Sequence, residues 1–255
     1  MIMKNFLLTT LLLLGFTLSA QEAQDTKVIV RTKAKDAKFI GTSMGGSMIL
    51  IKDATTGEIL SKGLTKGGTG NTGLIMNTPK ERYLEIGEGA AAFETTLSIT
   101  KPQFVTIEAL APANQKNATV FAQTQVWLIP GKHIDGDGIT LEIPGFVIEG
   151  LYPTTHQGLS IENDKSIEIK ANMVMMCGCP ISDGGLWDSN DIEVNAMIYV
   201  NGDYWKTIGM NISGTNTFTA NLELEKTGSH EVIITAYHSK SKNTGANQLN
   251  FRVGN

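Results

Sequence analysis

The sequence predicts an all-β protein built of two β-sandwich domains in tandem behind an N-terminal leader. Val, Ile and Thr recur in short runs, which is the composition of β-strands. Turn-forming residues, among them 27 glycines, separate these runs at short intervals. Several runs alternate apolar with polar residues, and no segment sustains a helical period. Together these features predict antiparallel sheets with one buried and one solvated face.

Residues 1–20 are predicted to be a secretory signal peptide. Lys4 supplies a positive charge, residues 6–16 are almost wholly apolar, and small residues end at Ala20 before the polar Gln21. The alternative is a retained membrane anchor, but the apolar run is short and no stop-transfer flank follows it. We therefore expect cleavage after Ala20 and an exported protein, periplasmic or extracellular, with no membrane span after cleavage.

The charge balance argues against one class of partner. Without Lys4 the chain has 20 basic and 25 acidic residues, a formal charge of −5. No Lys/Arg cluster is present, so the sequence lacks the electrostatic footprint of a nucleic-acid binder. Two cysteines cannot form a disulfide scaffold, and the fold must therefore depend on its apolar cores.

The first domain is expected to span residues 21–152. Its clearest strand places Phe93 and Leu97 on one face and Glu94 and Ser98 on the other, as a half-buried sheet requires. The expected strands, in chain order, are residues 26–32, 47–52, 58–61, 82–86, 93–99, 104–109, 120–128, 139–143 and 146–148.

A hairpin motif lies early in this domain. An apolar strand is followed by Asp53-Ala-Thr-Thr56-Gly57-Glu58 and a second short strand. In such a turn the aspartate accepts hydrogen bonds from the turn backbone, and the glycine takes a positive φ. Residues 47–72 resemble the opening hairpin of carboxypeptidase regulatory-like (transthyretin-like) β-sandwiches. The resemblance implies a similar fold for the domain and no particular activity.

The boundary between the two domains is expected near Tyr152. Around it the strand pattern gives way to Gly, Pro, Thr and Asn, the composition of a linker. The second domain, residues 153–255, then shows regular strand-like runs at spacings typical of a sandwich. These runs are residues 159–162, 166–176, 192–200, 205–208, 217–224, 231–238 and 248–253.

The end of the chain resembles bacterial immunoglobulin-like modules. Residues 218–237 read FTANLELEKTGSHEVIITAY, which is similar to a pair of strands near the end of those modules. Asn243-Thr-Gly245 and residues 249–253 continue the likeness, whereas the usual tryptophan and disulfide of the core are missing. The resemblance implies an Ig-like β-sandwich of a kind that binds, spaces or adheres and rarely catalyses.

Both cysteines lie in one unusual stretch, residues 173–180 (MVMMCGCP). Strand alternation places Met173 and Met175 in the core, where methionine fills gaps well. If residues 166–176 and 231–238 are strands B and F of an Ig fold, both finish at the same end of the sandwich. The cysteine loop and the end of the later strand are therefore expected to converge.

Metal binding is one hypothesis for this convergence. Thiolate and thioether ligands suit Cu(I), and imidazole suits copper or zinc. Cys177, Cys179 and His238 would supply three ligands and Met176 a fourth, although the spacing is not the Cys-x-x-Cys of structural zinc. Two alternatives stay open: buried reduced cysteines that pack as small hydrophobes, and a Cys177–Cys179 disulfide.

Trp187 and Asp188, on the Gly/Asp-rich loop that follows, are candidate ligand-binding residues. The indole could stack on a sugar, anchor a partner or fold back over the end of the sandwich. Catalytic motifs are lacking, and a nucleophile at Cys177 would have His238 as its one candidate base. We therefore expect an exported, non-catalytic binding or surface-accessory protein with an unknown protein, glycan or metal ligand. The alternative is a periplasmic copper (or zinc) binding protein.

Overall fold

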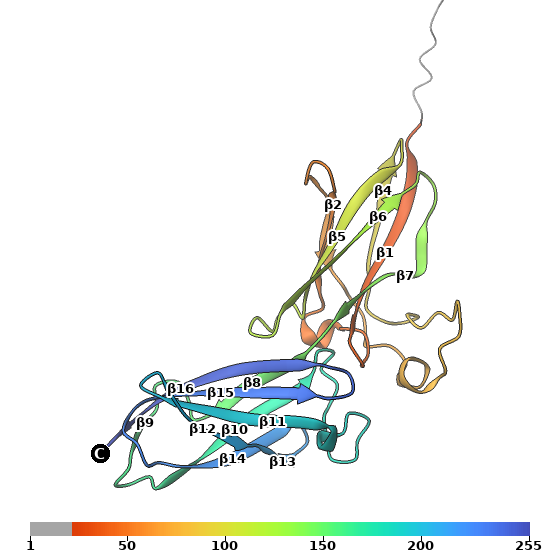
Figure 1. The fold of residues 1–255 in the computed structure, drawn as a ribbon. Coiled ribbons are helices and arrows are strands. Elements are labelled where there is room, and N and C mark those ends of the chain that lie inside the picture. The colour runs from red at the N-terminus through yellow and green to blue at the C-terminus, as the bar shows by residue number, and fades with distance from the viewer. Residues whose placement is uncertain (1–21) are drawn as a thin grey trace, which may run out of the picture.

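The computed structural model describes residues 22–255, so the predicted signal peptide lies outside the described residues. This part of the chain forms two β-sandwiches that meet end to end (Figure 1). The all-β tandem architecture expected from the sequence is confirmed. Among the helical turns of residues 22–255, none has the length and apolarity that a membrane crossing requires.

The first sandwich packs a three-stranded sheet, in the order β4-β1-β7, against a four-stranded sheet, in the order β3-β2-β5-β6. Alternate residues of β1 and β2, such as Val28 and Ile49, are fully buried between the two sheets. The strands are β1 (Gln24–Ala34), β2 (Met48–Asp53), β3 (Ile59–Leu64), β4 (Phe93–Ile99), β5 (Gln103–Ala111), β6 (Val120–Leu128) and β7 (Ile134–Ile143). Two short helical turns are η1 (Thr42–Met44) and η2 (Gly73–Asn77).

The predicted strand at residues 82–86 is wrong, because the segment pairs with no other strand. Its alternating Leu84 and Ile86 imitate a strand. The main-chain N–H groups of Ile86 and Gly87 instead donate to the carboxylate of Asp137 on β7, at 2.6–3.1 Å. A side chain thus satisfies this backbone where a neighbouring strand would otherwise be needed.

The second sandwich has an immunoglobulin-like topology. One sheet has the order β13-β14-β10-β8 and the other β12-β11-β15-β16-β9, which matches the arrangement of Ig strands, with β10 and β15 as strands B and F. The strands are β8 (Phe146–Tyr152), β9 (Gly158–Ser160), β10 (Ser166–Met175), β11 (Ile192–Val200), β12 (Asp203–Gly209), β13 (Asn211–Gly214), β14 (Thr217–Glu223), β15 (Gly228–His238) and β16 (Thr244–Gly254); η3 (Ser189–Asp191) precedes β11.

The sheet pairing moves the domain boundary from the predicted Tyr152 to Pro144–Gly145. Strand β8 pairs antiparallel with β10, with Ile148 opposite Met173, and so belongs to the second sandwich. The Gly- and Pro-containing segment that reads as a linker follows β8 and leads to the short edge strand β9. Composition alone could not distinguish a turn within the sandwich from a link between sandwiches.

The two sandwiches share apolar packing at their junction. One continuous cluster of buried side chains runs from the end of β1 and the turn after it into the core of the second sandwich. The first sandwich contributes Ala34, Ala37, Ile40, Met44, Ala111 and Ile143 to this cluster. Because buried side chains of both sandwiches pack together here, the two sandwiches are joined by a packed interface and not by a flexible linker.

Candidate functional site

A cleft of about 670 Å³ lies between the two sandwiches, and we call it the interdomain cleft. The end of β1, strand β7 and the segment around η2 form one wall, and the ends of β10 and β15 with the loop before η3 form the other. The lining residues are Lys33, Lys35, Asp36, Ile75, Met76, Lys80 and Glu142 from the first sandwich, and Phe146, Met175, Leu186, Trp187, Asp188, Asp191, Ile192, His238, Lys240 and Ser241 from the second.

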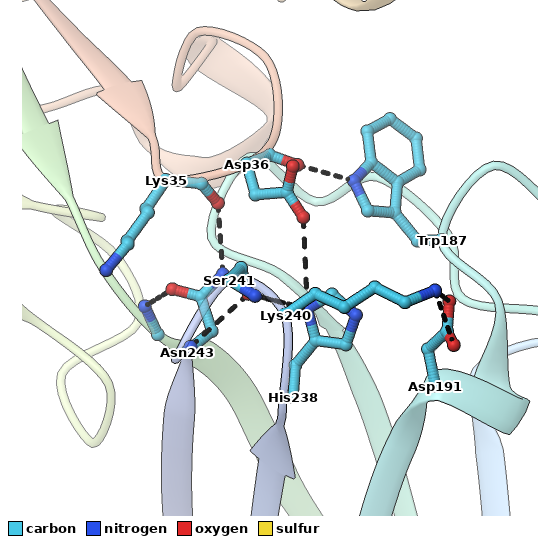
Figure 2. Close-up of polar contacts among 9 residues, drawn as sticks. Lys35, Asp36, Trp187, Asp191, His238, Lys240, Ser241 and Asn243 are labelled. Carbon is cyan, nitrogen blue, oxygen red and sulfur yellow. Dashed lines mark hydrogen bonds and ion pairs between the residues drawn. The ribbon is translucent and has the colours of Figure 1, made fainter.

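Asp36 links the two walls of the cleft (Figure 2). It lies in the tight turn after β1 with a φ of 55°, a left-handed conformation that aspartate tolerates better than most residues. Its carbonyl oxygen accepts a hydrogen bond from Trp187 Nε1 at 2.9 Å. Its carboxylate Oδ2 lies 3.8 Å from His238 Nδ1, an ion pair when the imidazole is protonated. Two residues of the second sandwich are therefore positioned by one turn of the first.

Asn243 makes a second bridge beneath the cleft. Its side chain is fully buried, Oδ1 accepts from the main-chain N–H of Gly145 at 2.9 Å, and Nδ2 donates to the carbonyl oxygen of Lys35 at 3.0 Å. The first partner lies at the start of the second sandwich and the other in the turn that ends β1. One amide side chain thus fixes the loop between β15 and β16 against the first sandwich.

His238, Ser241 and Asp36 resemble a catalytic triad in composition but not in geometry. Ser241 Oγ lies 2.6 Å from His238 Nδ1, and Asp36 approaches the same nitrogen. A triad requires the serine at one ring nitrogen and the carboxylate at the other, so that the imidazole can take the hydroxyl proton while the acid stabilises it. Here the serine and the aspartate lie at the same ring nitrogen, so the three side chains do not form a triad.

The charged side chains around the cleft differ in the ion pairs and hydrogen bonds that stabilise their charges. Lys240 pairs with Asp191 at 2.7 Å, and Asp188 caps η3 by accepting from Asn190. Hydrogen bonds from the main chain of Asn190, and then of Gly184, lower the pKa of the Asp188 carboxyl. Half-buried Lys33 lies on the opposite wall, and burial, reinforced by the positive charge of Lys80, lowers the pKa of its ammonium. The negative charges of Glu142 and Asp36 partly offset this effect, so the first wall carries neighbouring charges of both signs.

The cysteine loop is a disulfide, Cys177–Cys179, with the two Cα atoms 5.4 Å apart. Both residues are buried in the core that crosses the junction. Gly178 between them has a φ of 77°, and a Cβ there would meet Met44 of the first sandwich. The disulfide was one of the alternatives for this stretch. In this form neither sulfur is a thiolate, so Cys177 is not a nucleophile and the pair offers no metal ligands.

Strand alternation predicts that Met176, which follows the inward-facing Met175, faces outward, and this prediction is wrong. Its side chain is buried, because the chain turns at the end of β10 and the docked first sandwich covers what would be the solvent face. Residues 22–255 contain no group of three or more His, Cys, Asp or Glu side chains arranged to hold a metal ion. Copper or zinc binding by Cys177, Cys179, His238 and Met176 remains a prediction that concerns the reduced protein.

The structure divides the predicted site residues into two groups. His238, Trp187 and Asp188 line one wall of the interdomain cleft, whereas the disulfide and Met176 lie in the core behind it. The ends of β10 and β15 both reach this cleft, through Met175 and His238, whereas the cysteine loop itself does not line it. The first-sandwich wall and the Asn243 bridge could not be found from the sequence. Their roles depend on how the sandwiches dock, and no local motif marks them.

Comparisons with known proteins give only distant structural likenesses. No protein-family model matches the chain, and no curated protein matches it. An engineered protein is similar over 50% of this chain and 24% of its own, with 13% identity and a TM-score of 0.33. Fibronectin(III)-like modules of Clostridium thermocellum CbhA cover 89% of this chain and 94% of their own at 9% identity and a TM-score of 0.27. Tandem titin Ig domains cover 91% and 97% at 10% identity and a TM-score of 0.25. None of these likenesses carries a functional argument.

Proposed function

We propose that this chain is an exported, non-catalytic binding protein whose ligand occupies the interdomain cleft. The observation that carries the proposal is the cleft itself, which both sandwiches line and whose walls are joined through Asp36. Its volume of about 670 Å³ lies within the range of small-molecule sites. A ligand there would touch both sandwiches at once.

The lining suggests the kind of ligand. Leu186 and Trp187 supply apolar surface, while most of the other lining residues on both walls are polar or charged, among them Lys33, Glu142 and Lys240. Small-molecule sites commonly combine a mostly apolar lining with a few polar groups that fix orientation. The lining of this cleft is more polar than that pattern, so the cleft is suited to a polar or charged organic molecule with an apolar part that contacts Trp187.

Two features favour binding over catalysis. Ser241 and Asp36 both lie at Nδ1 of His238, so the three side chains do not form the serine–histidine–carboxylate arrangement of a hydrolase. Cys177 is bonded to Cys179 and is not available as a nucleophile. A screen for hydrolytic and transfer activities should therefore give no turnover that His238→Ala abolishes.

Export rests on the leader and has its own test. Expression of the whole gene in a Gram-negative host, followed by N-terminal sequencing of the exported fraction, should give a mature chain that begins at Gln21. An uncleaved chain that stays in the cytoplasm would contradict export and leave the cleft hypothesis unaffected.

Binding at the cleft is tested by a thermal-shift screen of a small-molecule library. A ligand that binds only the folded chain at a hundred times its Kd stabilises it by about 2.7 kcal/mol. This corresponds to a rise in Tm of several degrees for a chain of this length. Trp187→Ala should reduce the rise caused by a hit, and Trp127→Ala, a tryptophan change at the far end of the first sandwich, should not. Hits that stabilise both variants equally, or no hits at all, would contradict the proposal.

A further inference from the structure

A second hollow, of about 560 Å³, lies at the end of the first sandwich away from the junction, and we call it the distal groove. It is formed by the turn after β2, the turn between β4 and β5, and the end of β6. Ile99 at the end of β4 pairs with Gln24 at the start of β1, whereas the other end of β1 reaches the junction (Figure 1). An eleven-residue strand separates the two sites by roughly 30 Å.

Two aromatic rings form one side of this groove. Trp127 on β6 lies directly opposite Phe104 on β5, with ring centroids 5.0 Å apart and planes tilted by 34°. Trp127 is 58% exposed, so its indole presents most of its surface to solvent. A single exposed apolar side chain needs no explanation, but here a pair of rings lies in a hollow. Together they make an apolar platform open to a ligand.

Hydrogen-bonding side chains from the end of β2 and the start of β5 line the same groove. Asp53 accepts from the main-chain N–H of Thr55 at 2.9 Å, and its other oxygen accepts from Gln103 Nε2 at 3.0 Å. This contact fixes the orientation of the Gln103 amide. Within residues 22–255, the second N–H and the Oε1 of that amide have no hydrogen-bond partner. A donor and an acceptor thus line the same groove as the aromatic platform.

The combination matches the chemistry of a sugar ring. A pyranose has faces of C–H groups that pack on aromatic rings, and hydroxyl groups that donate and accept hydrogen bonds at its edge. The groove is lined by one acidic and one basic side chain, Asp53 and Lys101, so it has no net charge that would favour an acidic sugar. A membrane surface would be attracted by several basic side chains, and this groove has one.

We propose that the distal groove binds a neutral carbohydrate, with a pyranose ring stacked on Trp127 and its hydroxyl groups hydrogen-bonded to Gln103 and Asp53. This site goes beyond the proposed function, because it lies on a different face and uses no residue of the interdomain cleft. A chain with both sites would attach to a glycan through one end of its first sandwich and leave the cleft accessible.

The test is a calorimetric titration of the mature chain with neutral oligosaccharides: cellohexaose, laminarihexaose, mannohexaose, maltohexaose and chitohexaose. At least one should bind, and Trp127→Ala should weaken its binding by about tenfold or more. Gln103→Ala should weaken it as well. Phe121→Ala is the matched control, because this side chain is 52% exposed on the same strand but lies outside the groove. Trp187→Ala should leave sugar binding unchanged.

Three results would overturn the proposal. The first is that the wild-type chain binds none of the five oligosaccharides. Another is that Trp127→Ala binds as tightly as wild type, or that Phe121→Ala loses as much affinity. The last is binding to phosphatidylglycerol vesicles that Trp127→Ala abolishes while no sugar binds, which would assign the groove to a membrane surface. Thermal unfolding of each variant, monitored by circular dichroism, shows whether a lost signal reflects lost folding.

Discussion

Replacing Asn243 by alanine should loosen the junction between the sandwiches. The change removes two hydrogen bonds, to Gly145 N–H at 2.9 Å and to the carbonyl oxygen of Lys35 at 3.0 Å, from a fully buried position. A buried polar group left without a partner costs about 1–3 kcal/mol, and two such groups would remain. Because small rearrangements offset part of this loss, we expect the free energy of unfolding to fall by about 2–4 kcal/mol.

Urea denaturation followed by tryptophan fluorescence and circular dichroism measures this change. Asn243→Asp should cost at least as much, because it keeps an acceptor for Gly145 but turns a carboxylate toward the carbonyl oxygen of Lys35. Asn221→Ala, at an exposed position of β14 in the second sandwich, should stay within about 0.5 kcal/mol of wild type. If Asn243→Ala also stays within that margin, the bridge does not hold the sandwiches together and the reasoning is refuted.

Three further predictions concern single groups. Burial lowers the pKa of His230, so the unfolded chain takes up a proton more readily than the folded chain does. The free energy of unfolding should therefore fall as the pH drops below about 6.5. His230→Phe should flatten this fall, and an unchanged pH profile of the variant would contradict the prediction. Hydrogen bonds from the Gln103 side chain and the turn amides lower the pKa of Asp53 to about 2. The stabilisation of the fold by the ionised Asp53 should therefore be complete above a pH of about 4 and lost as the pH falls through 2. An NMR titration of Asp53 with a midpoint near the ordinary 3.9 would refute this. Thiol titration of the unfolded, non-reduced chain should find neither Cys177 nor Cys179 free. Elemental analysis should find no copper or zinc that the double variant Cys177→Ser/Cys179→Ser removes. Two free thiols and one bound metal would instead support the metal hypothesis.

The strands were the most predictable part of this protein. Alternation along a strand such as Phe93–Ile99 reports burial on one face, and that pattern is local to the chain. The same rule failed at residues 82–86, where Leu84 and Ile86 alternate but the Asp137 carboxylate replaces a partner strand. Sequence alternation records which side chains are buried and not what satisfies the backbone.

The site was less predictable, because it arises where two sandwiches dock. The Ig topology predicted that the ends of β10 and β15 lie at the same end of the sandwich, and both ends do reach the cleft. The burial of Met176 and the contacts of Asp36 and Asn243 depend instead on surfaces from opposite ends of the chain. No periodicity within one strand carries that information.

The most direct test of cleft binding uses the three tryptophans of the chain as reporters. Trp187 lines the cleft, Trp127 lies in the distal groove, and Trp205 lies on β12 of the second sandwich, packed against the His230 ring at a centroid distance of 6.1 Å. A ¹⁵N–¹H spectrum of the indole groups, recorded while a compound from the thermal-shift screen is added, should show the Trp187 signal move in proportion to occupancy. The signals of Trp127 and Trp205 should stay in place, and the compound should be recovered unchanged. A stationary Trp187 signal with movement at either of the others, or conversion of the compound, would contradict a non-catalytic binding site between the sandwiches.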